Sequence, residues 1–558
     1  MKRLIFCIAL FLVELMAYAQ SADWNFLVPP KGDVNLFSMN WVKHKGGYTF
    51  IGAFSTQLEL NQQIITNSNG WGLFLAKYDL NGAPISLSNI GHADLTTFGN
   101  SNFRFGLCVD TLDNTYFALS FKDSILVQNQ MEYGNNFFNA LTCKLDSQGN
   151  LVWREKIAGV GGASVGYNQC LQINLDQSIS LCVGVSDSTL IDTFWIQKGR
   201  GLFVNLDTNG QVNWIKKAGR DNVIGGYFGL NDKLSDNHYL IGVFETVNNI
   251  QFDNISVMAS NEYGSTTFNF ISKYNLQGQI QWVRHFGGAT FNARFNPNII
   301  KTDSKGNVYV SGSFRCQGSF DQVKVQGGGL YNGFGNDVFV LKYDKDGNFK
   351  WFKHTTITDE EEWRGFDISD HDELYLTYAY NTMSKFETDS VQSVGGRDIA
   401  LVKLDTLGNV VWMNSIGGSG GEEVVSLLCL DTTFYLLGQS TSTPCHFNQT
   451  DHTTQVPGNL FLARLNKYEL WPVGLQEPQW QSISIYPNPS NGTSTLSLPN
   501  ATQGTYTLYD MAGRDLLHQN LNPSQTLYTI STSSLSSGIY LLKLYTPQGN
   551  RSEKLVVE

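Results

Sequence analysis

The chain has 558 residues, of which 16% are charged and 13% aromatic, and it contains 54 glycines. Its 49 acidic and 38 basic residues give a formal net charge of −11, and the basic residues are scattered. This excludes nucleic acid and anionic lipid surfaces as partners, because both require clustered positive charge.

The first 19 residues predict a secretory signal peptide. Lys2 and Arg3 precede an apolar run over residues 4–13, and residues 17–19 read Ala-Tyr-Ala, a small-residue cleavage site. The run is too short to span a membrane, and no other segment approaches about 20 apolar residues. We therefore expect residues 1–19 to be removed, and the protein to have no transmembrane segment.

The remainder favours an all-β protein, since glycine, asparagine, threonine and aromatic residues are abundant and helical periodicity is missing. Seven cysteines follow the signal peptide, and their spacing fits no zinc motif. Their odd number excludes a complete disulfide framework. Cys170 and Cys182 flank a short turn, so they either form a disulfide across a hairpin or remain buried thiols, which are common in β cores.

An internal repeat organises most of the chain. Copies of the string FVLKYDKDGNFKW (339–351) occur at 141–153, 202–214, 270–282 and 400–412, with a variant at 73–86 and a truncated copy at 460–466. The strand that begins this string therefore occurs seven times, at intervals of 61 to 69 residues. We number the repeats one to seven in chain order.

Each repeat predicts four antiparallel strands, A to D. The C–D turn reads Asp-x-x-Gly, in which Asp or Asn caps the turn and glycine takes the left-handed position that closes a tight hairpin. A tryptophan recurs at one position of strand D, for example Trp351, although the first repeat has Ser86 there. A stripe at a fixed repeat position indicates packing between sheets rather than a ligand platform.

The seventh repeat stops after strand C, near Asn466. The segment SADWNFLV, with Trp24, precedes the first A–B pair and is a candidate for the missing strand D. Pairing the two would close a ring and remove two free sheet edges. We predict an all-β fold: a seven-bladed β-propeller over residues 20–471, closed by the N-terminal strand.

These repeats resemble the SBBP-type β-propeller repeats of secreted bacterial proteins. The resemblance rests on D-x-x-G-N-x-Y-x-x-G followed by F-x-x-K-Y/L-D-x-x-G-x-x-x-W, and it covers about four fifths of the chain. It implies a fold and no particular activity, because propellers have many unrelated functions.

Residues 472–481 read as a linker, and residues 482–558 hold some seven short strands separated by turn residues. That pattern is typical of a small, Ig-like β-sandwich. Pro487 and Pro489 are expected to end its first strand, and the Asn491-Gly492 step to turn the chain into the second.

The C-terminal segment resembles the type A sorting domain of type IX secretion cargo. The motifs YPNPSNG (486–492), LYDMAGR (508–514), LSSGIYLLKL (535–544) and KLVV (554–557) stand in that family's order. The resemblance implies that residues 482–558 engage the type IX machinery, which exports the protein through the periplasm and across the outer membrane. It also implies later removal of the domain, after which the cargo is tethered to the surface or released. The motif residues are Tyr486, Pro487, Asn488, Pro489, Gly492, Asp510, Gly513, Arg514, Gly538, Tyr540 and Lys554.

In a propeller, we expect a ligand where the D–A loops meet the innermost strands. The candidate ligand-binding residues in these loops are Phe103, Arg104, Arg294, Glu362, Trp363, Arg364 and Glu422. Aromatic and arginine side chains there would stack on a sugar ring or clamp a carboxylate. Alternatively, the aromatic residues anchor the loops and the acids form a solvated face.

Glycoside cleavage would require carboxylates about 5 to 9 Å apart, for which Glu362 and Glu422 are the candidates. The sequence lacks a serine nucleophile elbow, a His-x-x-x-His pair and a phosphate loop. Hairpin geometry explains the calcium-like turn at 343–348, although calcium at the acidic stretch 359–372 stays an alternative. We predict no cofactor and no metal ligands.

The leading interpretation is a non-catalytic propeller, secreted or on the cell surface, that binds or displays, with polysaccharide or protein as its ligand. One alternative is an extracellular propeller hydrolase or lyase acting on polysaccharide. Another is a structural surface component with no defined ligand.

Overall fold

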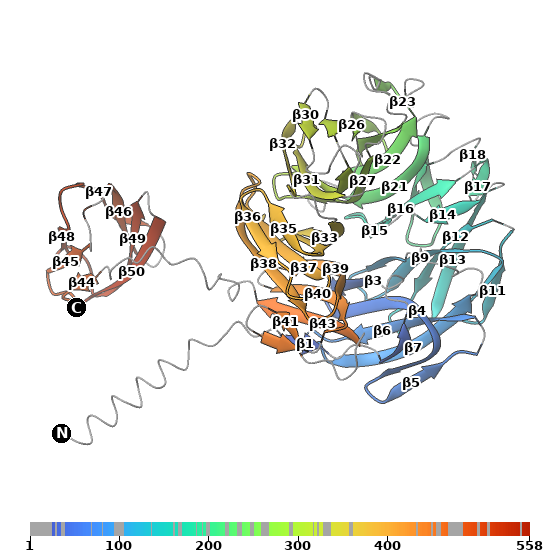
Figure 1. Cartoon of the computed structure of the whole chain (residues 1–558), viewed down its shortest axis with the longest axis horizontal. Helices are drawn as coiled ribbons and strands as arrows, with labels where there is room; N and C mark the ends of the chain where they lie inside the picture. The colour runs from blue at the N-terminus through green and yellow to red at the C-terminus, as the bar shows by residue number, and fades with distance from the viewer. Residues whose placement is uncertain are drawn as a thin grey trace. The chain divides into compact units, whose positions relative to one another are not determined.

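The chain forms two compact units, Met1–Leu470 and Trp471–Glu558. A computed structural model describes residues 25–27, 31–34, 40–68, 70–80, 82–93, 105–135, 137–159, 162–165, 170–185, 187–191, 194–196, 201–217, 223–231, 237–245, 250–257, 267–288, 294–315, 317–320, 323–326, 336–356, 361–430, 433–442, 444–447, 450–452, 459–466, 484–498, 501, 503–510, 514–546 and 549–558. Within these ranges all the regular elements are strands (Figure 1). No helix that could cross a membrane occurs among them.

The repeats fold into antiparallel four-stranded meanders. In the first repeat strands A to D are β3 (Asn40–His44), β4 (Gly47–Leu60), β6 (Trp71–Tyr78) and β7 (Pro84–Ala93), and in the second β8 (Gly106–Val109), β9 (Thr115–Phe121), β12 (Asn139–Leu145) and β13 (Leu151–Gly159). The third has β14 (Ala163–Val165) and β15 (Leu171–Ile173), which pair with successive parts of β16 (Ile179–Val185), then β19 (Gly201–Leu206) and β20 (Val212–Lys217). The fourth has β21 (Val223–Asn231), β22 (His238–Glu245), β25 (Thr267–Tyr274) and β26 (Ile280–Gly288).

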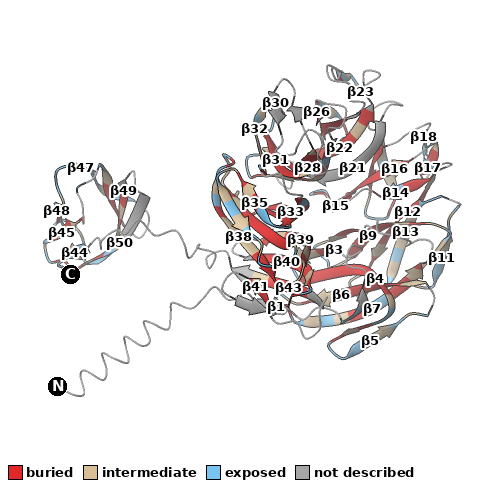
Figure 2. Cartoon of the chain, viewed as in Figure 1, coloured by how far each residue is buried: buried red, intermediate tan, exposed pale blue. Residues whose placement is uncertain are grey.

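The later repeats follow the same order. The fifth has β27 (Arg294–Thr302), β28 (Val308–Arg315), β31 (Asp337–Tyr343) and β32 (Phe349–His354), and the sixth has β33 (Glu362–Ile368), β34 (Leu374–Tyr380), β37 (Asp398–Leu404) and β38 (Val410–Gly418). The seventh has β39 (Glu422–Leu430), β40 (Thr433–Ser440) and β43 (Asn459–Asn466). Strands B and C are almost wholly buried, as β28 and β31 illustrate (Figure 2), which is why both read as nearly continuous apolar runs.

The N-terminal strand β1 (Asn25–Leu27) pairs antiparallel with β43, where strand D of the seventh repeat would lie. Trp24, which the sequence analysis placed in this strand, lies outside the described residues. The first and seventh repeats also share a hydrophobic core. Within it the Tyr48 hydroxyl donates a hydrogen bond to the Tyr435 hydroxyl. The two ends of the repeat array therefore contact each other.

The A strands lie side by side at the centre of the first unit. Successive A strands contact one another, and Figure 1 shows the sheets following each other around this centre. A polar link crosses three of these strands: Lys301 Nζ of β27 lies 2.7 Å from an Asp367 carboxylate oxygen of β33. The other oxygen of Asp367 accepts a 2.7 Å hydrogen bond from the Cys429 N–H of β39. The C-terminal ends of these strands are therefore brought close together.

The connections between strands B and C form hairpins, which the sequence analysis did not predict. They are β4–β5 (Gln63–Thr66), β10 (Ser124–Val127) with β11 (Gln130–Tyr133), β17 (Thr189–Ile191) with β18 (Phe194–Ile196), β23 (Ile250–Phe252) with β24 (Ile255–Val257), β29 (Gln317–Phe320) with β30 (Val323–Gln326), β35 (Met383–Phe386) with β36 (Asp389–Gln392), and β41 (Cys445–Phe447) with β42 (Thr450–His452). Several pair with strand D of the preceding repeat, as β17 does with β13. A further short strand, β2 (Lys31–Val34), pairs with β4. Such pairing covers edges that would otherwise be open to another chain.

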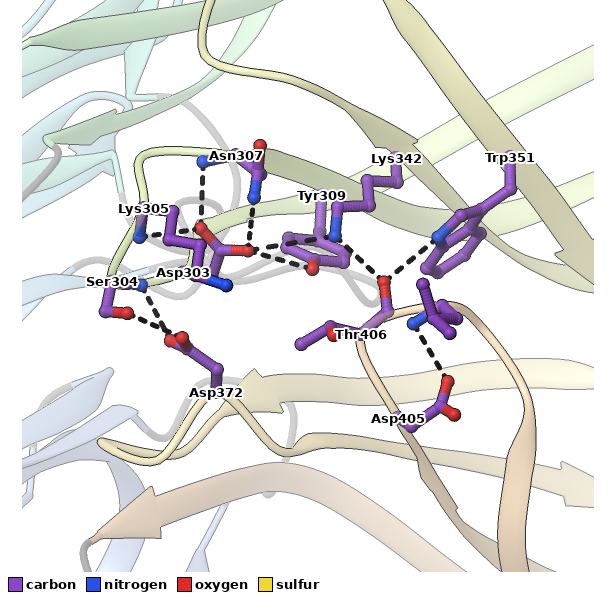
Figure 3. Close-up of polar contacts among 11 residues, drawn as sticks. Asp303, Ser304, Lys305, Asn307, Tyr309, Lys342, Trp351, Asp372, Asp405 and Thr406 are labelled. Atoms are coloured by element: carbon purple, nitrogen blue, oxygen red, sulfur yellow. Dashed lines mark hydrogen bonds and ion pairs between the residues drawn. The ribbon is translucent and has the colours of Figure 1, made fainter.

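A lysine and a tryptophan of one repeat bind the same carbonyl group of the next (Figure 3). The Thr406 carbonyl, in the C–D turn of the sixth repeat, accepts 2.8 Å and 3.2 Å hydrogen bonds from Lys342 Nζ and Trp351 Nε1 of the fifth. The Lys345 carbonyl likewise accepts from Lys273 and Trp282. The recurring tryptophan therefore packs between repeats, as the sequence predicts, and each hydrogen bond contributes about 1 kcal/mol.

Cys170 and Cys182 lie opposite each other, and the Cys182 N–H donates a 2.8 Å hydrogen bond to the Cys170 carbonyl. Their side chains are thiols, so the disulfide alternative is wrong for this structure. Both residues are buried in the hydrophobic core around the third repeat, as the other alternative proposed.

The C-terminal unit has two sheets that share one hydrophobic core. One consists of β44 (Ser484–Tyr486), β45 (Thr493–Ser497) and β48 (Leu527–Ser531), and the other of β46 (Gly504–Tyr509), β47 (Asp515–Leu521), β49 (Gly538–Thr546) and β50 (Gly549–Val557). As predicted, β44 ends immediately before Pro487. Gly492 has a φ of +96° in the turn that leads into β45, a conformation that favours glycine.

Candidate functional site

The candidate site lies where the neighbouring inner strands β33 and β39 begin. Each starts with a glutamate, Glu362 in β33 and Glu422 in β39, and each has a register shift within its first five residues. Such a bulge redirects side chains locally. It brings charged side chains from the sixth and seventh repeats together at this end of the inner strands.

Two arginines and two glutamates form a closed set of ion pairs, which we call the Arg–Glu ring. Arg364 binds Glu362 and also Glu423, the latter at 2.6 Å. Arg397, immediately before β37, binds Glu362 and lies 3.5 Å from Glu423. The Glu362 side chain is 50% exposed, whereas that of Arg364 is only 10% exposed. The ring therefore presents its Glu362 side to solvent.

The charge state of the ring follows from these contacts. Burial tends to raise the pKa of Glu362, but the hydrogen bonds from Arg364 and Arg397 bring that pKa below its ordinary value. Glu362 is therefore ionised at neutral pH. With two guanidinium groups and two carboxylates, the ring is formally neutral and offers both hydrogen-bond donors and acceptors.

A buried pair of acids lies close to the ring. Asp398 and Glu422 are both fully buried. Asp398 Oδ2 accepts a 3.0 Å hydrogen bond from the Val394 N–H, and Glu422 Oε1 accepts one of 2.9 Å from Ser440. Asp398 Oδ1 and Glu422 Oε2 have no hydrogen-bond partner in the described part of the chain. Burial, with a smaller contribution from the charge of Glu422, raises the pKa of Asp398 to about 6.

The site differs from the prediction in two residues. Trp363 is buried, and its indole N–H donates a 2.8 Å hydrogen bond to Ser311 in the core. It is therefore an anchor of β33, and the expectation that its ring stacks on a sugar is wrong. Glu422 is buried below the surface, and its neighbour Glu423 takes the position in the ring.

The remaining predicted residues are only partly described. Arg294 begins β27 and pairs with Arg315 across the sheet, and its side chain lies outside the described residues, as do Phe103 and Arg104. Arg397 is the functional candidate that sequence reasoning missed. Its only signal is a lone arginine after two glycines before strand C, which no periodicity distinguishes.

No group of three or more histidine, cysteine, aspartate or glutamate side chains that could hold a metal occurs in the described ranges. In the turn at 343–348, Asp344 Oδ1 accepts the N–H groups of Asp346 and Asn348. The hairpin reading of that turn is thus supported by its contacts.

Comparison with known proteins identifies the C-terminal unit. Residues 484–558 match the family described as the secretion system C-terminal sorting domain. This confirms the predicted sorting domain, and the protein is exported by type IX secretion to the cell surface or the extracellular space.

The first unit has no comparable sequence match, since no curated protein sequence matches the chain. Among solved structures, the whole chain is similar to an ulvan lyase of polysaccharide lyase family PL25, at 8% identity and a TM-score of 0.38 over 80% of this chain and 95% of that one. It is also similar to the phage phi92 endosialidase, at 10% identity and a TM-score of 0.35 over 96% of this chain and 88% of that one. A protein of unknown function from Bacteroides caccae gives 10% identity and a TM-score of 0.26, over 62% of this chain and 92% of that one. Likeness at this level carries no argument about activity.

Proposed function

We propose that this protein is an exported seven-bladed β-propeller that binds a polysaccharide or protein ligand at the Arg–Glu ring without turning it over. Two observations support the propeller. Each repeat supplies an A–D meander, and β1 completes the last one by pairing with β43. Shared cores between the first and seventh repeats support a closed ring.

The observation that supports the binding role is that the half-exposed Glu362 carboxylate is paired with both Arg364 and Arg397. A glycosidase needs a carboxylic acid that is still protonated near neutral pH and faces the substrate. Glu362 has a lowered pKa and binds two arginines. Such a ring suits hydrogen bonding to hydroxyl or amide groups better than proton transfer.

A hydrolase or lyase is the second candidate, and Asp398 is the observation that favours it. Its pKa of about 6 suits a general acid. Its carboxyl group is fully buried, however, and a Cβ atom added to Gly417 would lie only 2.0 Å from its Cγ. Catalysis would require the 417–421 segment to move and expose Asp398.

The proposal can be tested by probing a glycan array and a panel of soluble polysaccharides with the purified protein. Turnover of each polysaccharide would be followed by assays for reducing ends and unsaturated products. We expect binding without turnover, and at least tenfold weaker binding by Arg397→Ala. The control is Glu387→Gln, which removes the separate Lys353–Glu387 ion pair and is expected to bind normally.

The other outcomes each decide against the proposal. Turnover that Asp398→Asn abolishes would establish the enzyme. Binding that survives both Arg397→Ala and Glu362→Gln would place the ligand elsewhere. Absence of any ligand in both screens and in pull-downs with surface proteins would favour the structural component.

A further inference from the structure

Hairpin β17–β18 carries the only tryptophan that the described part of the chain exposes to solvent. Trp195 is 57% exposed, whereas the other described tryptophans are buried or half-buried. Leu190, directly opposite Trp195 in the hairpin, is 49% exposed. Large apolar side chains placed together on a surface indicate that something covers them.

The apolar pair is not required to form such a hairpin. The residues at the same register positions in the other repeats are Gln251 and Ser256, Ser319 and Lys324, Lys385 and Ser390, His446 and Asp451, Leu126 and Met131, and Glu59 and Ile64. Most of these pairs are polar, and all the hairpins form. The fold therefore does not explain Leu190 and Trp195.

Charged side chains adjoin this pair. Leu190 pairs with Ala158 of β13, and Lys156 and Arg154 lie two and four residues before Ala158 on the same face of that strand. Figure 1 shows β11, β13, β17 and β18 at the outer edge of the first unit.

The charged side chains beside the apolar pair bind one another. Arg154 Nε lies 2.6 Å from one Glu132 carboxylate oxygen, and Lys156 Nζ lies 3.2 Å from the other. Two cations share one carboxylate, so this patch is formally positive by one charge on a protein that is acidic overall. We call Glu132, Arg154, Lys156, Leu190 and Trp195 the outer aromatic surface.

We propose that the outer aromatic surface binds a polysaccharide chain. Sugar rings present apolar C–H faces that stack on Trp195, and their hydroxyl groups hydrogen bond to Arg154, Lys156 and Glu132. Trp195 is held on a paired strand, so little conformational entropy is lost on binding. The chain is exported to the cell surface or beyond, where polysaccharides are accessible.

The size of the surface favours a linear glycan over a protein. A stable protein complex covers about 800 Å² on each partner. The apolar part here consists of Leu190 and Trp195, and even a fully covered aromatic side chain contributes only about 150–250 Å². A short run of sugar rings matches a small patch that has one exposed aromatic residue beside charged side chains.

Affinity electrophoresis of the purified protein in gels containing alginate, xylan or laminarin tests this surface. We expect at least one polysaccharide to retard the protein, Trp195→Ala to weaken the apparent affinity at least tenfold, and Trp195→Tyr to retain most of it. The matched control is Ile64→Ala, which removes an exposed apolar side chain at the same register position of β4–β5 and is expected to change nothing. Equal melting temperatures of the variants would show that Trp195→Ala is folded.

The proposal is independent of the Arg–Glu ring, because Arg397→Ala is expected to leave this retardation unchanged. It is overturned if no polysaccharide retards the protein, or if Trp195→Ala is retarded as strongly as the wild type. It is also overturned if Trp195→Ala leaves glycan binding intact and abolishes binding of a surface protein instead.

Discussion

Two equivalent glycines allow a direct test of how the repeats pack. Gly149 and Gly347 occupy the same position in the C–D turns of the second and fifth repeats, with φ of +87° and +81°. A Cβ atom on Gly347 would lie 2.9 Å from the Trp282 ring of the preceding repeat. A Cβ atom on Gly149 would have no atom within 4 Å, because the first repeat has Ser86 where the others have tryptophan.

Replacement of either glycine by alanine forces an L-residue into a left-handed conformation, which costs about 1–2 kcal/mol. Gly149→Ala should lower the free energy of unfolding by that amount alone. In Gly347→Ala the added methyl group also collides with Trp282. That ring is buried and its Nε1 is bonded to the Lys345 carbonyl at 3.1 Å, so it cannot move aside freely. Overpacking adds about 1–3 kcal/mol, for a total of about 2–5 kcal/mol.

Urea unfolding followed by tryptophan fluorescence and circular dichroism would measure both variants. We expect a clearly larger decrease in the midpoint for Gly347→Ala than for Gly149→Ala at an unchanged m-value. In a Trp282→Leu background the additional cost of Gly347→Ala should largely disappear, since neighbouring residues are energetically coupled. Equal midpoint shifts for the two single variants would refute the packing argument.

Three further predictions concern other parts of the chain. Because burial raises the pKa of Asp398 to about 6, the folded state binds its proton more tightly than the unfolded state, and stability falls as the pH rises from about 4 to about 6. Asp398→Asn should therefore be about 1–3 kcal/mol more stable than the wild type at pH 7.5 and similar in stability near pH 4. Melting temperatures of both proteins measured against pH would test this, and a difference in melting temperature that does not change with pH would contradict it. Deleting residues 20–27 removes β1 and exposes the edge of β43. We therefore expect a lower melting temperature and self-association measured by light scattering. An unchanged melting temperature without self-association would argue against closure of the ring. Asn488 donates a 2.6 Å hydrogen bond to the Lys554 carbonyl and accepts one of 2.8 Å from the Val556 N–H. Asn488→Ala should therefore destabilise the sorting domain by about 1–3 kcal/mol and reduce the exported fraction measured by cell fractionation. The control variant Asn491→Ala should change neither the stability nor the exported fraction.

Much of the fold followed from short-range patterns. The C–D turns were predictable because the Asp344 side chain caps N–H groups only two and four residues away, so the five-residue motif contains the whole interaction. Similarly, Pro487 ends β44 through its own missing N–H and restricted φ. The B–C hairpins were missed because strands such as β17 have three residues and too little alternation to be recognised.

The candidate site was less predictable, for a definite reason. Trp363 looked like a ligand platform in the sequence, yet it bonds to Ser311, 52 residues earlier. Glu362 and Arg364 were predicted in a D–A loop, and in the structure they lie in the first residues of β33. Their partners Arg397 and Glu423, however, follow them by tens of residues, and nothing periodic connects the four.

By itself the sequence determined the repeat, its turns, the strand order and the export signal, because each depends on residues that are close in the chain or on a motif that other proteins recognise. Only the tertiary structure decided which charges pair, which aromatic residues are covered and which remain exposed. Ion pairs and stacking depend on separations of a few ångströms between strands of different repeats. Those separations are set by how whole sheets pack, so Trp363 and Trp195, two tryptophans in one sequence, end in opposite environments.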